Sequence, residues 1–383
     1  MERLAVLELY SGIGGMHYAL KESGVDAEVV AAVDVNTTAN EIYRHNFPAT
    51  PLWSKTIECI TLDEFNKLQF DMILMSPPCQ PFTRIGLQGD ISDPRTKSFL
   101  YILQLLPRLT KRPQFLLLEN VKGFETSSAR GSLVKTLKDC GYIYEEFLLS
   151  PTNLGIPNSR LRYFLIARTL PGKFSFPATS EILETFPDVA TSESVPERPR
   201  PTSVSKQDQE RQILYKLETP SELERKRSQN SDGSIRVLQE YLQEETELED
   251  VGQFLLPPKT LLRYALVMDI VQPTCRRSVC FTKGYGHYVE GTGSVLQSCM
   301  NVEVLDQCSQ FVWCLDSLSE EEKLKQLSKL RLRYFTPREI ANLMGFPAHF
   351  GFPEKTSIKQ QYRVLGNSLN VHVVARLIKL MVQ

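Results

Sequence analysis

Cys79 and Glu119 are the residues of this chain whose types and spacing could do chemistry together. Cys79 lies in a Ser-Pro-Pro-Cys-Gln segment after an apolar run at 72–75, and Glu119 directly follows a second apolar run at 115–118. If both runs are parallel strands, their carboxyl ends meet at one crevice of an open α/β sheet. A thiol and a carboxyl group that share a crevice predict covalent attack on a ring carbon, assisted by an acid.

Cytosine is a ring that requires this chemistry. Its carbon 5 is a poor nucleophile, but thiolate addition at carbon 6 turns the ring into an enamine that can attack a methyl sulfonium. Cys79 would supply the thiolate, and we expect nearby positive charge to lower its pKa. Glu119 would protonate or hydrogen-bond ring N3, for which it must hold its proton better than a free glutamate does. The alternatives are a buried, inert Cys79 and a solvated Glu119 carboxylate, which the flanking prolines and the spacing disfavour.

A glycine turn after the first predicted strand, 4–9, indicates a cofactor site. The turn reads Ser-Gly-Ile-Gly-Gly and departs from the G-x-G-x-x-G dinucleotide fingerprint, and many such turns serve only for packing. Asp34 ends the second predicted strand, 28–33, where its carboxylate can accept hydrogen bonds from ribose hydroxyls. Together the two features favour a nucleoside cofactor without a pyrophosphate.

Two basic segments suggest contacts with a base or with phosphates. Arg160 and Arg162 share one face at the entry of a predicted strand, where they could hold a base carbonyl, a phosphate or Glu119, or form a surface salt bridge. The segment 275–286 mixes basic and aromatic residues with glycine, as nucleic-acid contacts do, although an exposed hairpin has a similar composition.

The elements that position these residues alternate between strand and helix over the first half of the chain. This alternation predicts an α/β fold with a mostly parallel sheet covered by helices on both faces. Further strands are expected at 71–75, 115–118, 143–149 and 163–167, and helices from the glycine turn to Gly24, at 37–45, 98–109 and 127–140.

The pattern breaks after the last of these strands. We assign 1–174 and 331–383 to a catalytic domain and 175–330 to a small target-recognition domain. A Pro-, Ser-, Glu- and Arg-rich composition predicts a disordered insertion at about 187–250 within the second domain. The remainder of that domain is expected to contain a helix near 261–271 and a short strand at 278–282.

Core-like sequence returns near the C-terminus. Thr336, Pro337 and Glu339 form a helix start in which threonine caps, proline takes the first helical position and glutamate completes a capping box. A last helix at 370–381 has one apolar face, which the main sheet is expected to cover.

Composition limits the class of protein. The 383 residues are 42% hydrophobic, and no apolar stretch or N-terminal leader predicts a membrane span or export. None of the eight cysteines forms a Cys-x-x-Cys pair, so neither zinc nor a disulfide framework is expected. Residues 181–250 carry 17 acidic and nine basic side chains, so the rest of the chain is at +7 while the whole is at −1. A polyanionic substrate is therefore permitted but not required.

Taken together, these residues resemble the cytosine-C5 methyltransferase family over about 4–170 and 333–381. The similarity lies in the glycine turn, Asp34, the cysteine loop, Glu-Asn-Val at 119–121, the paired arginines and Gly-Asn-Ser at 366–368. The resemblance implies a Rossmann-like methyltransferase sheet that uses S-adenosylmethionine and releases S-adenosylhomocysteine. It implies a catalytic set of Cys79, Glu119, Arg160 and Arg162 and a cofactor set of Tyr10, Gly12, Ile13, Gly14, Gly15, Asp34, Ile57, Glu58, Ser76, Asn367 and Ser368.

Within that family the chain most resembles the eukaryotic type-2 branch, whose small lobe carries Cys-Phe-Thr as at 280–282. The branch implies methylation of cytosine 38 in the anticodon loop of aspartate tRNA, with DNA as a weaker partner. It also implies residence in the cytoplasm, with the nucleus as a second location, and no metal or membrane. A loop cytosine is already unstacked, which agrees with a small recognition lobe. The expected substrate contacts are Arg276, Arg277, Cys280, Phe281, Thr282 and Lys283.

Three other functions compete with this interpretation. The first is the same chemistry on duplex DNA, and the second is a binding module that has kept the fold without activity. The third is a nicotinamide oxidoreductase, which the missing third fingerprint glycine and the reactive-cysteine loop disfavour.

Overall fold

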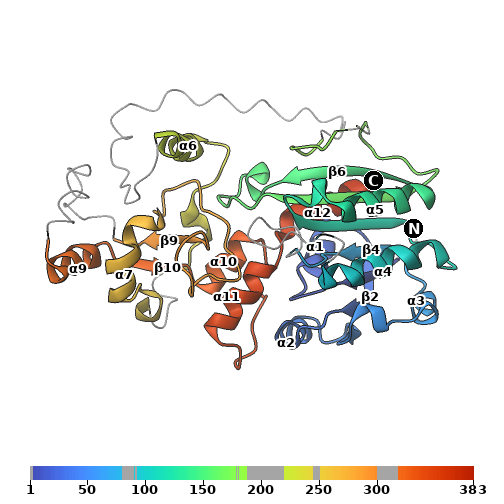
Figure 1. The fold of residues 1–383 in the computed structure, drawn as a ribbon, viewed down its shortest axis with the longest axis horizontal. Helices are drawn as coiled ribbons and strands as arrows, with labels where there is room; N and C mark the ends of the chain where they lie inside the picture. Colours follow the sequence, from blue (N-terminus) through green and yellow to red (C-terminus); the bar gives the residue numbers. More distant parts are fainter. Residues whose placement is uncertain are drawn as a thin grey trace.

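The larger of two β-sheets dominates the architecture. The computed structural model describes residues 3–79, 90, 93–177, 179, 181–187, 220–244, 251–299 and 318–383. A seven-stranded sheet has the order β3-β2-β1-β4-β5-β7-β6, and a three-stranded sheet with the order β10-β9-β8 lies at the opposite end of the molecule (Figure 1). Helices α10 and α11 stand between the two sheets.

The strands of the large sheet follow the predicted alternation. They are β1 (Leu4–Leu9), β2 (Ala27–Val33), β3 (Leu52–Trp53), β4 (Met72–Met75), β5 (Phe115–Val121), β6 (Tyr142–Leu149) and β7 (Arg162–Thr169). The first five run parallel to one another, whereas β7 is antiparallel to both β5 and β6. The mostly parallel sheet is thus confirmed. The link between β6 and β7 is short and includes one turn at Pro151–Leu154, too short for the crossover that a parallel pair needs.

Helices cover both faces of this sheet, as predicted. The helices on the two faces are α1 (Gly15–Ser23), α2 (Thr37–Asn46), α3 (Leu62–Leu68), α4 (Lys97–Leu105), α5 (Ser128–Asp139) and α12 (Val371–Val382), and the two helices between the sheets are α10 (Pro337–Leu343) and α11 (Ile358–Asn367). Along β1 the buried side chains alternate, since Val6 packs in the core with α1, α2 and α12, and Leu7 packs in the core with α3, α4 and α5. This alternation is the period of two that a strand covered on both faces requires.

The C-terminal segment returns to the sheet of the first domain. The cap of Thr336 is confirmed, because its hydroxyl accepts from the Glu339 amide while the Glu339 carboxylate accepts from the Thr336 amide. The predicted apolar face of α12 is also buried, and it lies against α1 in the first of the two cores.

The small sheet differs from the sequence expectation in two places. The helix predicted at 261–271 is present as α7 (Pro258–Tyr264) and a 3-10 turn at Ala265–Val267, and it is wrong beyond them, because the chain then enters β8 (Asp269–Val271). The strand predicted at 278–282 is an irregular segment, and the strand is β9 (Ser294–Gln297). β9 pairs with β8 and with β10 (Leu332–Tyr334), so the boundary drawn at residue 331 cuts through this sheet.

The insertion predicted to be disordered at 187–250 is partly ordered. Residues 188–219 and 245–250 lie outside the described part of the chain. The intervening 220–244 form α6 (Pro220–Ser231) and a short helix at Leu238–Tyr241. The disorder prediction is wrong for these residues because Lys226 pairs with the half-buried Asp269 at 2.8 Å and Leu238 is fully buried.

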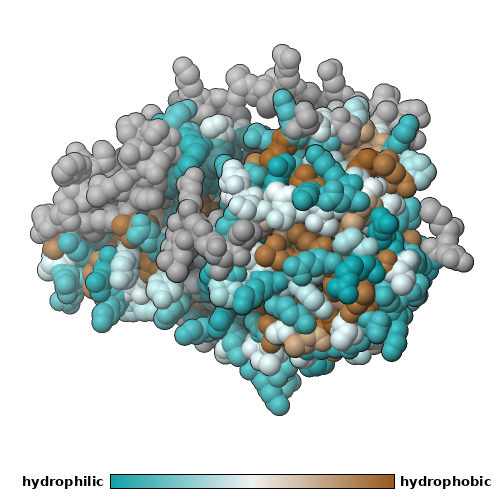
Figure 2. Space-filling model, turned by 45° about the vertical axis from the view of Figure 1, so that its right-hand side comes forward, coloured by the Kyte–Doolittle hydropathy of each residue, from teal (hydrophilic) through white to brown (hydrophobic). Residues whose placement is uncertain are grey.

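The surface shown in Figure 2 mixes hydrophilic and hydrophobic residues without one dominant apolar face. Among the described residues, no helix combines the length and the hydropathy needed to cross a membrane.

Candidate active site

A cavity of about 370 Å³ opens at the carboxyl ends of β1, β2, β4 and β5 and is closed by the end of α11. It is lined by Tyr10, Ser11, Gly12, Ile13, Gly15, Met16, Asp34, Val35, Asn36, Ala39, Ser76, Pro77, Pro78, Cys79, Glu119, Val121, Arg160, Arg162, Val364, Gly366, Asn367, Ser368 and Leu369. The cavity therefore brings together all four predicted catalytic residues and eight of the eleven predicted cofactor residues.

The glycine turn and Asp34 form one end of the cavity. Gly12 has a φ of 52°, a left-handed conformation that glycine adopts without steric cost. The Asp34 carboxylate accepts hydrogen bonds from the Gly12 amide at 2.9 Å and from the Asn36 amide at 2.8 Å. Asp34 therefore ties the turn to the end of β2 while its carboxylate borders the cavity. This is the position expected for a group that binds ribose hydroxyls.

Tyr10 is held rigidly beside this turn. Its hydroxyl donates to Ser98 at 2.9 Å, and its carbonyl accepts from the Ser76 hydroxyl at 3.2 Å. Burial raises the pKa of Tyr10, and the Glu58 and Asp34 carboxylates add to the effect. The ring is thus a neutral, fixed wall of the cavity.

The remaining three predicted cofactor residues do not line the cavity. Gly14 precedes α1, and a Cβ atom there would approach the Phe47 ring to 2.4 Å, so its role is to allow close packing. Ile57 is buried in the core, and Glu58 is an exposed residue whose charge acts on Tyr10.

Cys79 lies four residues beyond the end of β4. The buried Asn120 side chain donates to the Pro77 carbonyl at 3.3 Å and so ties the cysteine loop to β5. Burial and the neighbouring Glu119 raise the pKa of Cys79, although Arg162 and Arg160 oppose them. The expected lowering by positive charge is thus present but outweighed, because the thiolate would lose hydration and face a carboxylate.

Glu119 is 9% exposed and lies within β5 rather than at its end. β7 pairs antiparallel with β5 in a register that sets Arg162 opposite Val121, and the Arg162 Nε atom is 3.5 Å from a Glu119 carboxylate oxygen. Burial raises the pKa of Glu119, and the two guanidinium groups only partly offset this effect. Glu119 thus retains its proton better than a free glutamate, in the direction that an acid requires.

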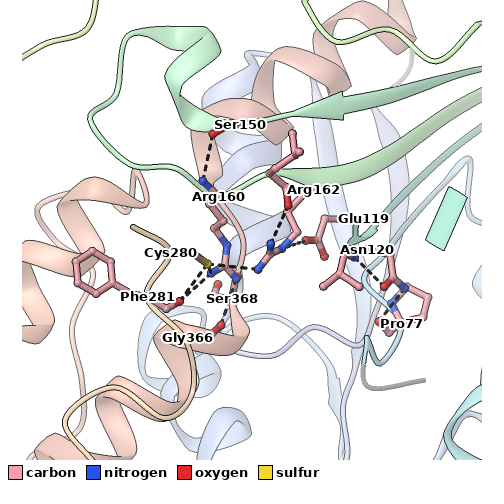
Figure 3. A network of polar contacts seen from close by, with 12 residues as sticks. Pro77, Glu119, Asn120, Ser150, Arg160, Arg162, Cys280, Phe281, Gly366 and Ser368 are labelled. Carbon is pink, nitrogen blue, oxygen red and sulfur yellow. Dashed lines mark hydrogen bonds and ion pairs between the residues drawn. The ribbon is translucent and has the colours of Figure 1, made fainter. Parts of the chain in front are cut away.

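Arg160 and Arg162 have different surroundings. The Arg160 guanidinium donates to the Phe281 carbonyl at 3.0 Å, to the Gly366 carbonyl at 3.2 Å and to the Ser368 carbonyl. Arg160 thereby links its own segment, which follows β6, to Phe281 of the small domain and to the end of α11. Figure 3 shows the two guanidinium groups side by side between Glu119 and Cys280. Arg162 forms the ion pair with the Glu119 carboxylate and has the larger effect on its pKa, whereas Arg160 mainly holds the wall of the cavity.

Cys280 lies between these guanidinium groups. Its sulfur is 3.2 Å from an Arg160 nitrogen and 3.7 Å from an Arg162 nitrogen. Burial alone would raise the pKa of Cys280, but the two positive charges outweigh it and lower the pKa. Of the predicted substrate contacts, Cys280 is therefore in direct contact with catalytic residues.

The other predicted substrate contacts divide into buried and accessible residues. Arg277 is 5% exposed and makes a two-point ion pair with Asp269, and Phe281 is 2% exposed. The Phe281 ring points away from the arginines in Figure 3. Arg276 is half-buried and donates to the Ile235 carbonyl. We therefore revise the roles of Arg277 and Phe281 to structural ones. Thr282 remains half-buried and Lys283 exposed.

Sequence reasoning missed several residues that border the cavity. Val35 follows Asp34 and is 60% exposed, which is unusual for a valine and marks an apolar wall beside the ribose position. Gly366 belongs to the Gly-Asn-Ser segment at 366–368 that carries the family resemblance, but it was not predicted as a cofactor residue. A Cβ atom there would lie 2.2 Å from the Thr282 carbonyl carbon, so only glycine allows this close approach. The sequence shows only that a valine follows the acidic strand end, and its exposure becomes evident in the structure.

The described residues contain no group of three or more His, Cys, Asp or Glu side chains that could hold a metal ion.

Replacing Arg160 by alanine should destabilise the fold at this junction. Its carbonyl partners are buried at Phe281 and half-buried at Gly366 and Ser368, and hydrogen bonds to charged groups contribute about 1.5–3 kcal/mol each, so we expect a loss of about 3 kcal/mol. Urea denaturation measures the free energy of unfolding. Arg44, which is exposed and contacts Ser54, provides the control, and its alanine variant should change the stability by less than about 0.5 kcal/mol. Equal effects of the two substitutions would contradict the role given to Arg160.

Comparison with known proteins agrees with this geometry. The sequence pattern of C-5 cytosine-specific DNA methylases matches residues 4–383. A human tRNA (cytosine(38)-C(5))-methyltransferase is 58% identical over 399 residues, and the alignment covers 100% of both chains. A DNA (cytosine-5)-methyltransferase of Dictyostelium discoideum is 37% identical and covers 100% of this chain and 95% of its own.

A crystal structure of a DNMT2 variant from Spodoptera frugiperda has a similar fold. The TM-score is 0.78 at 40% sequence identity, and the match covers 99% of this chain and 100% of that one.

Proposed function

Because the chain belongs to the C-5 cytosine-specific DNA methylase family and is a cytosine-C5 methyltransferase, we propose that it methylates cytosine 38 of aspartate tRNA with S-adenosylmethionine as methyl donor. The observation that carries the chemistry is that Cys79 and Glu119 line one cavity with Asp34 and the glycine turn. The substrate is supported by the relatives, since the human protein at 58% identity is named for cytosine 38 of tRNA.

The residues that border the cavity fit the proposed cofactor. Asp34 would hold the ribose hydroxyls, Tyr10 and Val35 would border the adenine, and Asn367 with Ser368 would border the methionine end. The cavity has no phosphate-binding fingerprint, which suits a nucleoside without a pyrophosphate. When bound, S-adenosylmethionine supplies an electrophilic methyl group.

The side chains of the cavity would carry out the other steps of the reaction. The Cys79 thiolate bonds to carbon 6 of cytosine while Glu119 gives or shares a proton at N3, so that negative charge does not accumulate on the ring. Carbon 5, now nucleophilic, takes the methyl group. The carbon-5 proton then passes to water, the carbon 6–sulfur bond breaks with its electron pair remaining on Cys79, and the N3 proton returns to Glu119, which restores the aromatic ring and the acid.

Arg162 keeps the acid usable through this cycle. It lies 3.5 Å from the Glu119 carboxylate, so it stabilises the charge left on Glu119 when the proton moves to the ring. The pKa of Glu119 nevertheless stays raised by burial, so the proton is present when the base arrives.

Two arguments favour tRNA over DNA as the substrate. A cytosine in an RNA loop is already unstacked, whereas a duplex cytosine must be extruded at a cost of a few kcal/mol. The relatives give the second argument, since the human protein at 58% identity is named for cytosine 38 of tRNA. The second candidate is DNA, which is favoured by the name of the Dictyostelium discoideum relative at 37% identity.

A transfer assay separates these substrates. Labelled methyl groups from S-adenosylmethionine are offered with total tRNA, with duplex DNA, and with an aspartate-tRNA anticodon stem-loop carrying cytosine or uracil at position 38. We expect transfer to tRNA to exceed transfer to DNA by about 100-fold, the factor that a few kcal/mol of base extrusion implies.

The uracil-38 stem-loop is the internal control and should accept no label. Equal or faster labelling of DNA would replace the tRNA proposal by the DNA one. Labelling of the uracil-38 stem-loop would show that another position is the target.

A further inference from the structure

The loop at 282–292 packs against α11, the helix whose end closes the catalytic cavity. Its first residues lie against Gly366, where the Thr282 carbonyl carbon would be 2.2 Å from an added Cβ atom. Gly286 lies against the ring of Tyr362, one turn earlier on α11. The loop is therefore fixed along α11, whose end lines the cavity.

The aromatic side chains in and beside this loop differ in their exposure to solvent. Phe281 is 2% exposed and Tyr285 is 3% exposed, and both pack in the core of the molecule. Tyr288 is 65% exposed, although its backbone is held by hydrogen bonds from its amide to Gly284 and from the Thr292 hydroxyl to its carbonyl. Among the described residues, the Tyr288 hydroxyl has no hydrogen-bond partner. A rigid backbone thus presents an aromatic ring to solvent.

Basic side chains are exposed on the same loop and on α11, against which the loop packs, and one acidic side chain, Glu290, is exposed on the loop as well. Lys283 is exposed on the same loop, and Lys359 and Arg363 are exposed on the neighbouring α11. These two are four residues apart, and Asn367 follows after another four, so the three side chains share one face of the helix. Because Asn367 lines the cavity, this face leads from the basic side chains to the catalytic site.

We propose that Tyr288 is a stacking platform for an unpaired base of the substrate RNA close to the target cytosine. The proposal rests on the RNA substrate proposed above. An exposed aromatic ring with basic neighbours is the combination that binds single-stranded nucleic acid, because every base has a face that can stack and the phosphates pair with the cations. A loop nucleotide beside cytosine 38 offers such a base, whereas a duplex keeps its bases stacked on each other.

The test compares Tyr288→Leu with Tyr288→Phe. Leucine keeps apolar bulk over Gly284 but has no aromatic face, and phenylalanine keeps the face and loses the hydroxyl. Binding of the anticodon stem-loop is measured in the presence of S-adenosylhomocysteine, together with KM and kcat for methyl transfer. We expect Tyr288→Leu to weaken RNA binding and raise KM by at least about fivefold, and Tyr288→Phe to match the natural protein.

Leu170→Ala is the matched surface control. Leu170 is 61% exposed and follows the last residue of β7, at the end of the strand far from the cavity. Its replacement should therefore leave RNA binding unchanged. All variants should bind S-adenosylhomocysteine with unaltered affinity, which shows that the cavity is intact.

A series of stem-loops with one abasic nucleotide beside cytosine 38 identifies the stacked base. One abasic position should weaken binding to the natural protein and have no further effect on Tyr288→Leu, because both changes remove the same contact. A purely structural role for Tyr288 would instead lower the affinity for all stem-loops equally and overturn the proposal. Normal binding by Tyr288→Leu would also overturn it, and failure of the natural protein to methylate any tRNA would overturn both proposals.

Discussion

Replacing Cys79 by alanine should abolish methyl transfer while the protein still folds and binds its cofactor. The side chain lies in the cavity with Glu119 and would supply the electron pair that activates carbon 5, and it is the one thiol among the described residues that line the cavity. Loss of a covalent nucleophile costs several orders of magnitude, and we expect a fall in kcat of at least about 10⁴-fold. Single-turnover transfer to the anticodon stem-loop measures it.

A trapping experiment tests the covalent step separately from turnover. Stem-loop RNA with 5-fluorocytosine at the target position cannot release the enzyme, because fluorine occupies the place of the proton that must leave. The natural protein should form a covalent complex, Cys79→Ala should form none, and Cys59→Ala, at an exposed cysteine outside the cavity, should behave like the natural protein. A complex formed by Cys79→Ala would assign the nucleophile to another residue.

The core of the catalytic domain was predictable because its signals are local. A strand, a glycine turn and an acidic strand end are each written in a few consecutive residues, and so is the capping box at Thr336. Parallel strands then place their carboxyl ends together, so Cys79 and Glu119 had to meet. Predicting that these two side chains share a crevice required only the two strands and the residues that follow them.

The small sheet was not predictable in the same way. β9 is four residues long, and its neighbours β8 and β10 are three residues each, so none of these strands has a periodic pattern long enough to identify it. The sheet forms because β9 finds partners more than 20 residues before and 30 residues after it. Such pairing is decided by tertiary contacts, which override local propensity.

The partners of charged side chains could not be predicted from the sequence either. Arg276 and Arg277 are adjacent and looked equivalent, yet the structure buries Arg277 against Asp269 and leaves Arg276 half-buried. Phe281 was a candidate for stacking, but it packs against Phe335 inside the molecule. An exposed ring is found instead at Tyr288, which no local pattern distinguished from Tyr285.

The two reactive groups of the cavity have opposite protonation requirements. Cys79 must lose its proton, although burial and Glu119 raise its pKa. Glu119 must keep its proton, and burial raises its pKa as well. The productive form therefore combines a thiolate with a neutral acid, and its population rises with pH as Cys79 ionises and falls when Glu119 does. Methyl transfer by the natural protein should follow such a two-sided pH profile.

Glu119→Gln should lower the single-turnover rate and remove one side of this profile. Glutamine keeps the shape of the neutral acid but cannot transfer a proton to N3, and general acid catalysis contributes about 10²–10⁴-fold. Because glutamine does not titrate, the fall in rate that Glu119 ionisation causes at higher pH should vanish, while the rise from Cys79 ionisation remains. Rates measured at saturating stem-loop and cofactor across the pH range give both results.

Glu145 provides the matched control for this substitution. It is a 2% exposed carboxylate on β6 whose pKa burial also raises, but it accepts hydrogen bonds from Thr179 and does not line the cavity. Glu145→Gln should therefore keep both the rate and the two-sided profile. If Glu119→Gln retained a near-normal rate, Glu119 would be a structural partner of Arg162, and the proton at N3 would have to come from elsewhere. If its rate fell but the high-pH side persisted, the group that titrates there would be a different one, and the acid role would pass to that group.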